Sequence, residues 1–267
     1  MVKEHKASIS RACRVAQIDR KTYHNQAKRK KDDDMIETLL KDLSAQYPRY
    51  GFEKLFSMLR NKGHLYNHKR VRRIYCALEL NLKVKAKKRL APRTKVALEQ
   101  PSELNKCWSL DYMSDALVTG RRFRTANVID DCNRGAIGIL ASHSLPSLRI
   151  TNWLDRLAEV KGYPDTIRVD NGPENISKHF QKWASERNIH IRYIQPGKPA
   201  QNAYIERFNR TYREAILDMY LFKNVQEVQA LTDNWIKHYN EERPHEALNN
   251  LTPKHFERQL QQNYSIF

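Results

Sequence analysis

The order of apolar patterns between residues 107 and 242 constrains the fold of this chain more than any other feature. Three segments rich in strand-forming residues come first, at 107–117, 123–131 and 135–144, and short turns join them. They predict three antiparallel strands. Helical and strand patterns then alternate, with helices expected at 147–162, 177–188, 202–217 and 225–242 and strands at 166–170 and 189–195.

This order predicts an α/β fold: a mixed five-stranded sheet with helices packed on both faces. The helices expected at 147–162 and 202–217 each have one apolar face, which should pack against the sheet. The expected core positions on these two helices are Ile150, Trp153, Leu154, Leu157, Ile205, Phe208, Tyr212 and Ile216.

The positive charge of the chain is concentrated in its first two-fifths. The formal net charge is +18, and residues 1–106 hold 27 Lys and Arg against 11 Asp and Glu. Such a block indicates a polyanionic partner, and nucleic acid is favoured because no amphipathic membrane helix is recognisable. The sequence contains no run of about 18 apolar residues, so no membrane span is predicted. The N-terminus does not resemble a secretory signal. The four scattered cysteines form no CxxC pair, which fits a reducing cytoplasm.

The basic block begins with a weak helix-turn-helix signal at residues 7–27. Ala12, Val15, Ile18 and Tyr23 are its small or apolar positions, and Asp19 can cap the second helix. Residues 28–34 are a charge run, which is expected to be a loop or a frayed helix end.

Two further helices are expected on either side of a turn at residues 61–64. The apolar face of the first holds Phe52, Leu55, Phe56 and Leu59, and that of the second holds Val71, Ile74, Tyr75 and Leu78. A basic segment with Pro92 follows at 83–95 and reads as a linker. Basic side chains of the second helix and the linker are candidate DNA contacts, with a solvated cationic face as the alternative: Lys69, Arg70, Arg72, Arg73, Lys85, Lys87, Lys88 and Arg89.

These boundaries divide the chain into five expected segments. The first two are an N-terminal helical segment at 1–30, which could form a helix-turn-helix, and a basic helix-turn-helix-like domain at 31–82. A basic linker at 83–104 leads to the catalytic core at 105–220. Residues 221–267 are expected to extend the core as helices.

Three carboxylates stand out by their context. Asp111 interrupts the first strand of the core, Asp170 ends its fourth strand, and Glu206 lies near the start of the helix after "PGKPAQ". Carboxylates are ligands that Mg²⁺ prefers, and paired Mg²⁺ ions can stabilise phosphodiester cleavage. Structural alternatives remain open: Asp170 could form an Asx-turn, and Glu206 could pair with Arg210. The acids near turns are expected to be structural, namely Asp115, Asp130 and Asp131.

The motifs around these carboxylates resemble the signature blocks of OrfB-type DDE transposases from two-frame bacterial insertion sequences. The matching blocks are "WSLDYMSDALVTGRRFRTANVIDDCNR", "RVDNGPEN", "IQPGKPAQNAYIERFNRTYRE" and "YNEERPHEALNNLTPKHF", with a helix-turn-helix block ahead of them. The resemblance runs from about residue 8 to residue 258. It implies a retroviral-integrase-like core with a ribonuclease H fold, and a bacterial, cytoplasmic, nucleoid-associated protein.

The resemblance also implies a chemistry and its residues. Asp111, Asp170 and Glu206 match the catalytic triad, which implies two Mg²⁺ ions, for which Mn²⁺ can substitute. The implied reaction is cleavage at an element end and 3′-OH strand transfer into double-stranded DNA. By their spacing, Asn202, Arg210 and Arg213 lie roughly on the Glu206 side of their helix and are candidate DNA contacts, with a solvated face as the alternative. The sequence departs from the family pattern at Gly135 and Arg207, where an acid and a serine are usual.

The implied partners are the element ends and the target DNA, further copies of the chain in a homo-oligomer, and a first-frame protein of the same element. Two other functions remain open at this stage. One is a non-catalytic DNA-binding regulator or relic of the element. The other is a ribonuclease H-like nuclease, against which the basic N-terminus and the "RPH" block argue.

Overall fold

The computed structural model describes residues 7–24, 32–83, 98, 100–195 and 199–264. Its contacts divide the chain into two compact units, Met1–Pro48 with Asn67–Asn81, and Arg49–Tyr66 with Leu82–Phe267. None of the described helices combines the length and the apolar character that a membrane span needs.

The first unit begins with two short helices, α1 (Ile9–Val15) and α2 (Arg20–His24). The predicted cap before α2 is confirmed, because the backbone N–H of Lys21 donates to Asp19 Oδ1 at 2.7 Å. The predicted apolar face is confirmed only in part. Ala12 is buried together with Cys13, whereas Val15, Ile18 and Tyr23 are exposed, because helices this short cover little surface.

Helix α3 (Asp33–Gln46) begins inside the charge run that was expected to be a loop or a frayed end. Acidic residues in a first turn interact favourably with the helix dipole, so "DDD" is a helix start. Asp33 itself is buried and accepts hydrogen bonds from Arg70 Nε at 2.6 Å and from Arg73 Nη2 at 2.9 Å. Both arginines belong to α5 (His68–Ala77), so the ion pairs join α3 to α5.

The apolar faces predicted around the turn at 61–64 are largely confirmed. In α5, Val71, Ile74 and Tyr75 are buried. In α4 (Phe52–Asn61), which belongs to the second unit, Leu55 and Leu59 are buried together with Met58. The rings of Phe52 and Phe56 are half-buried and stack with centroids 5.8 Å apart.

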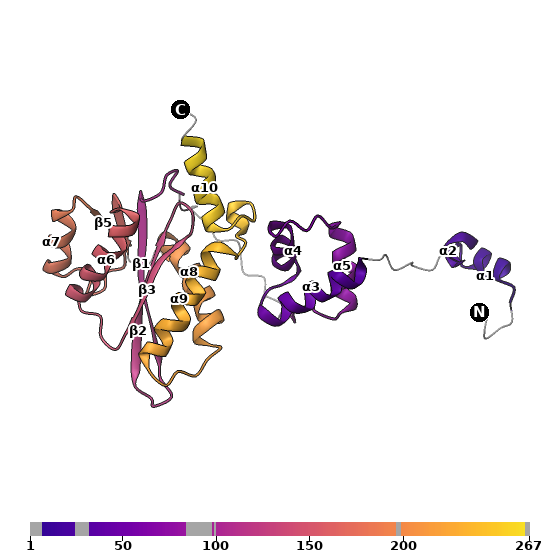
Figure 1. The fold of residues 1–267 in the computed structure, drawn as a ribbon, viewed down its shortest axis with the longest axis horizontal. Helices are drawn as coiled ribbons and strands as arrows, with labels where there is room; N and C mark the ends of the chain where they lie inside the picture. Colours follow the sequence, from indigo (N-terminus) through magenta and orange to yellow (C-terminus); the bar gives the residue numbers. More distant parts are fainter. Residues whose placement is uncertain (1–6, 25–31, 84–97, 99, 196–198, 265–267) are drawn as a thin grey trace. The chain divides into compact units, whose positions relative to one another are not determined.

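The second unit contains the predicted five-stranded mixed sheet (Figure 1). The order of its strands is β3-β2-β1-β4-β5. Its strands are β1 (Cys107–Ala116), β2 (Arg122–Asp130), β3 (Ala136–Ser142), β4 (Thr166–Val169) and β5 (His190–Tyr193). The first three pair antiparallel as the predicted meander, and β4 lies parallel to both β1 and β5. The long strand β1 is therefore central.

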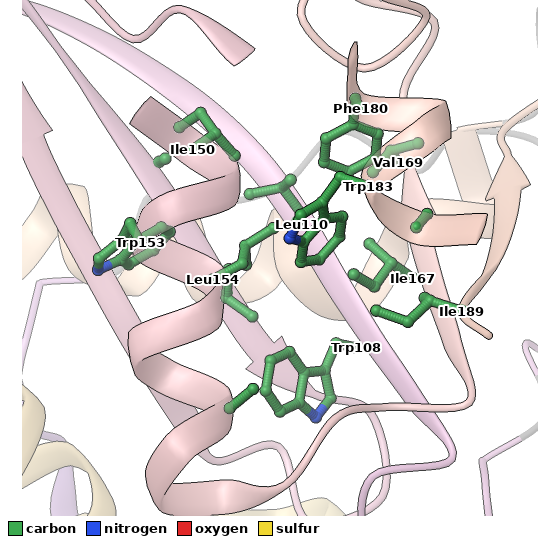
Figure 2. Packing of buried hydrophobic residues seen from close by; sticks show 14 of the residues in the cluster. Trp108, Leu110, Ile150, Trp153, Leu154, Ile167, Val169, Phe180, Trp183 and Ile189 are labelled. Atoms are coloured by element: carbon green, nitrogen blue, oxygen red, sulfur yellow. The ribbon is translucent and has the colours of Figure 1, made fainter. Parts of the chain in front are cut away.

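Helices cover both faces of the sheet, as predicted. Helices α6 (Ser147–Lys161) and α7 (Lys178–Glu186) lie on one face, and α8 (Ala203–Tyr212) and α9 (Val225–Glu241) lie on the other (Figure 1). Figure 2 shows side chains of α6 and α7 packed against Trp108 and Leu110 of β1 and Ile167 of β4. Of the eight expected core positions, only Leu157 is half-exposed.

One glycine allows α6 to approach the sheet closely. A Cβ on Gly138 of β3 would lie 2.9 Å from Leu157 Cδ2 and 3.0 Å from the Trp153 ring, which is closer than side chains tolerate. The absence of a side chain at this position therefore lets the helix pack directly on the strand.

The helix predicted at 202–217 is less regular than expected. A 3-10 turn (Pro199–Asn202) precedes α8, and a π-helical turn (Arg213–Leu217) follows it. After α9, the "RPH" segment leads through another 3-10 turn (Glu246–Leu248) to α10 (Pro253–Tyr264). Helix α10 lies within residues 221–267, which were expected from the sequence to extend the core as helices, although no bounds were predicted for it.

Candidate active site

The parallel pairing of β1 with β4 brings two of the candidate carboxylates together. Ser109 of β1 pairs with Arg168 of β4. Two residues further along, the same register places Asp111 beside Asp170, which directly follows β4. Side chains two residues apart on a strand point to the same side, so the two acids continue one row at this edge of the sheet.

Asp111 is half-buried, and both of its carboxylate oxygens accept a hydrogen bond. Oδ1 accepts from the backbone N–H of Tyr112, and Oδ2 accepts from Asn209 Nδ2, each at 2.8 Å. The buried Asn209 is held in turn by Asn127 of β2, whose Nδ2 donates to Asn209 Oδ1 at 2.7 Å. This chain of amides ties α8 to the two central strands of the sheet.

Asp170 forms the Asx-turn that was the structural alternative to a role as a metal ligand. Its Oδ1 accepts from the backbone N–H of Gly172 at 3.0 Å and from Asn175 Nδ2 at 2.8 Å. Asn175 is fully buried and accepts a hydrogen bond from the Tyr112 hydroxyl at 3.0 Å. Only Oδ1 takes part in these bonds, and no hydrogen bond to Oδ2 occurs within the described residues, so the turn leaves one oxygen for a ligand.

Glu206 lies in the first turn of α8 and is exposed. It precedes Asn209 by three residues, so the two side chains share one side of the helix. The expected alternative, an ion pair between Glu206 and Arg210, is not formed. Arg210 Nε instead lies 3.7 Å from Glu214 Oε1, and both side chains are exposed.

The three carboxylates influence one another electrostatically. Burial, together with the negative charges of Asp170 and Glu206, raises the pKa of Asp111 to about 6, against the hydrogen bonds from Tyr112 and Asn209. A cation placed among these oxygens would relieve that repulsion. The donor set, carboxylate oxygens only, is the kind that Mg²⁺ prefers. No three His, Cys, Asp or Glu side chains of the described ranges already form a metal-binding group.

The acids expected to be structural have structural partners. Asp131 and Arg168 form a buried ion pair, and Asp130 accepts hydrogen bonds from the backbone N–H groups of Asn105 and Cys132, each at 2.8 Å. Asp115 Oδ2 lies 3.0 Å from Arg213 Nη1. None of them has a bond to the three carboxylates of the candidate site.

The basic residues proposed from the sequence as DNA contacts have mixed surroundings. Arg70 is mostly buried and serves the structural pair with Asp33, a role that the sequence did not indicate, and Arg73 shares that acid. Lys69 and Arg72 are exposed on α5. Four of the candidates, Lys85, Lys87, Lys88 and Arg89, lie outside the described residues.

The three candidates near Glu206 also differ from one another. Arg210 is exposed, which suits a contact with DNA. Arg213 is half-buried and pairs with Asp115. Asn202 is buried, so its side chain is not at the surface where DNA would lie.

The amides that hold the carboxylates were not predicted from the sequence. Asn209 is the last residue of the "ERFN" segment, and Asn175 is the last residue of "RVDNGPEN", so both lay inside quoted motifs. The available signal for Asn209 was its position three residues after Glu206 on the predicted helix, which places both side chains on one side. No local signal could have indicated Asn127, which reaches the site only through the pairing of β2 with β1.

Comparisons with known proteins agree with the fold. Residues 31–89 match the HTH-like domain, and residues 101–199 and 187–253 match the integrase core domain. A chain of the simian T-cell lymphotropic virus intasome has a similar fold, with a TM-score of 0.50 and 14% identity, covering 82% of this chain and 74% of that one. The fold is therefore that of an integrase core of the ribonuclease H-like kind, preceded by an HTH-like domain.

Two relatives are proteins of bacterial insertion elements. An uncharacterized 31.7 kDa protein of insertion element IS407 from Burkholderia multivorans is 35% identical over 253 residues, which is 94% of this chain and 91% of that protein. A transposase for insertion sequence element IS904 from Lactococcus lactis is 25% identical over 223 residues, covering 79% and 88%. The chain belongs to the family of OrfB-type insertion-element proteins, as its motifs predicted.

Proposed function

We propose that this chain is a transposase that cleaves a DNA strand at the ends of its insertion element and joins the new 3′-OH to target DNA. The observation that carries the proposal is the electrostatic coupling of Asp111 with Asp170 and Glu206 at one edge of an integrase core. The ionised form of the half-buried Asp111 is costly beside the charges of Asp170 and Glu206 unless a cation joins them. A purely structural role for all three would not need this arrangement.

The reaction would occur in two displacements at phosphorus. In the first, a water oxygen forms a bond to phosphorus and the bond from phosphorus to the 3′-oxygen breaks. The water gives up a proton, and the leaving 3′-oxygen takes up a proton to become the 3′-OH. In the second, this 3′-oxygen forms a bond to a target phosphorus, loses its proton, and displaces a target 3′-oxygen that takes up a proton. Bound Mg²⁺, two ions in the proposal with Mn²⁺ as a substitute, would stabilise the charge on the phosphodiester oxygens.

The residues of this chain would then position the carboxylates. Asp111, Asp170 and Glu206 would hold the ions, Asn209 would orient Asp111, and Asn175 would orient Asp170. The substrate would be double-stranded DNA, which the basic N-terminal residues would bind with affinity that falls as salt rises. A homo-oligomer and a first-frame partner of the element remain part of the proposal.

The test is a strand-transfer assay with pre-nicked DNA that already has a free 3′-OH, in Mg²⁺ or Mn²⁺. It compares the wild type with Glu206→Gln, and with Glu214→Gln as a matched control on an exposed acid two turns further along. Joined product from the wild type and Glu214→Gln, but not from Glu206→Gln, would support the proposal. Absence of product from all three, with salt-sensitive DNA binding retained, would favour a non-catalytic DNA-binding protein.

A further inference from the structure

A basic pocket of about 390 Å³ lies beside α8. It is on a different side of the helix from Glu206. Helix α8 contributes Tyr204 and Arg207 to its wall. The loop before β3 contributes Arg134, and the segment after α9 contributes Arg243, His245 and one acid, Glu246. None of the three carboxylates of the candidate active site lines this pocket, so it is a separate feature of the core.

Aromatic rings, and not carboxylates, hold two of the three guanidinium groups. Arg134 lies over the ring of Tyr204, 3.1 Å from its centroid, and donates a hydrogen bond to the backbone oxygen of Asp131. Arg243 lies over the ring of Tyr50 at 4.9 Å. A guanidinium stacked on a ring keeps N–H donors in its own plane available. Within the described ranges, no ion pair with a carboxylate neutralises either arginine or Arg207.

His245 gives the pocket a further polar group besides the three guanidinium groups. Its ring packs edge-on against Tyr239, with centroids 4.9 Å apart. Its Nε2 is buried and has no hydrogen-bond partner in the described part of the chain. Burial, together with the nearby charge of Arg243, lowers the pKa of His245 to about 3. The ring is therefore neutral at physiological pH and can donate one N–H to an oxygen atom.

We propose that this pocket binds a phosphodiester of the DNA strand that passes α8. The assignment rests on the proposed function, because it takes DNA as the substrate. The planar forks of Arg134, Arg207 and Arg243 match the oxygens of a phosphate group, and His245 offers a further donor. Arg207 directly follows Glu206, so a phosphate held here would belong to backbone next to the strand at the carboxylates. The pocket also gives a role to Arg207, where the family pattern usually has serine, and to the "RPH" segment.

The test measures binding of the full chain to a short DNA duplex of unrelated sequence over a range of salt concentrations. The variants are Arg207→Gln and Arg243→Gln, and the control is Arg156→Gln, an exposed arginine of α6. Loss of one phosphate contact should reduce the slope of log affinity against log salt by about 1 and weaken binding several-fold. The control variant should bind as the wild type does. Arg207 is exposed, so Arg207→Gln should fold normally even if Arg243→Gln does not.

Unchanged slope and affinity in folded Arg207→Gln would overturn the proposal. A second arm adds inorganic phosphate at matched ionic strength and measures the melting temperature. Stabilisation of the wild type by phosphate, with DNA binding unaffected by the variants, would mean a site for small free anions and would overturn the assignment to DNA. A reduced salt slope in a protein without strand transfer would support the pocket while the proposed catalysis failed.

Discussion

Asn209 of α8 donates a hydrogen bond from Nδ2 to Oδ2 of Asp111, across 98 residues of sequence and 2.8 Å of space. The same amide accepts from Asn127 through its oxygen, so its orientation is determined at both ends. A helix on one face of the sheet therefore holds a carboxylate of the central strand. In other metal sites, removing a residue that supports a metal ligand in this way typically reduces metal affinity or activity by about 10–100-fold.

Replacing Asn209 by alanine should reduce strand transfer about 10–100-fold and raise the Mg²⁺ concentration needed for half-maximal rate. Asp111 would lose a donor, and the buried Nδ2 of Asn127 would lose its acceptor, which should also destabilise the fold by about 1–3 kcal/mol. A magnesium titration of activity and a urea titration measure the two effects. Asn234→Ala, at an exposed position of α9, is the control. A normal magnesium titration in Asn209→Ala would contradict the positioning role.

The raised pKa of Asp111 predicts a specific pH dependence of stability without metal. Its pKa rises from 3.8 to about 6 on folding, so the folded state favours the protonated form. The stability that this group contributes is complete below pH 4 and is lost as the pH rises through 6. Because the side chain is half-buried, we expect a change of about 2 kcal/mol.

Comparison with Asp111→Asn isolates this effect from other titrating groups, including Asp130, whose pKa burial also raises to about 6. Unfolding free energies of both proteins should be measured in EDTA from pH 4 to pH 7.5. The difference should move in favour of the variant as the pH rises, and Mg²⁺ should stabilise only the wild type. A pH-independent difference would show that the carboxylate is not perturbed.

The buried ion pair between Arg168 and Asp131 predicts a large loss of stability when one partner is removed. The arginine side chain is 4% exposed and the aspartate 0%. Arg168→Met should destabilise the fold by about 3–5 kcal/mol because Asp131 would be left charged and unpaired. Adding Asp131→Leu should restore much of this loss, since an apolar pair removes the uncompensated charge.

Chemical denaturation measures both variants against Lys182→Ala, which removes an exposed pair with Glu186 and should cost less than about 1 kcal/mol. If Arg168→Met were as mild as this surface control, the ion pair would contribute little. If the double variant were no more stable than Arg168→Met, the cost would come from lost packing and not from the unpaired charge.

Local pattern was sufficient to predict the order and type of the core elements. Strands repeat every two residues and helices every 3.6, so alternation and one-sided faces can be recognised before any contact is known. The motifs likewise identified Asp111, Asp170 and Glu206 as the residues to examine. Helix α3 was not recognised, because an acidic run such as the one at its start is usually exposed to solvent. In the structure, Arg70 and Arg73 of α5 pair with Asp33 and allow it to be buried.

The sequence alone thus determined the order of the core elements, the family and the candidate carboxylates, because these depend on residue type and short-range spacing. Only the tertiary structure decided which residues meet. The parallel register of β1 and β4 places Asp111 beside Asp170, and the packing of α8 on the sheet brings Asn209 to Asp111. Strand pairing and helix packing are long-range contacts, so no local pattern specifies them. The meeting of Arg134, Arg207, Arg243 and His245 in one pocket has the same origin.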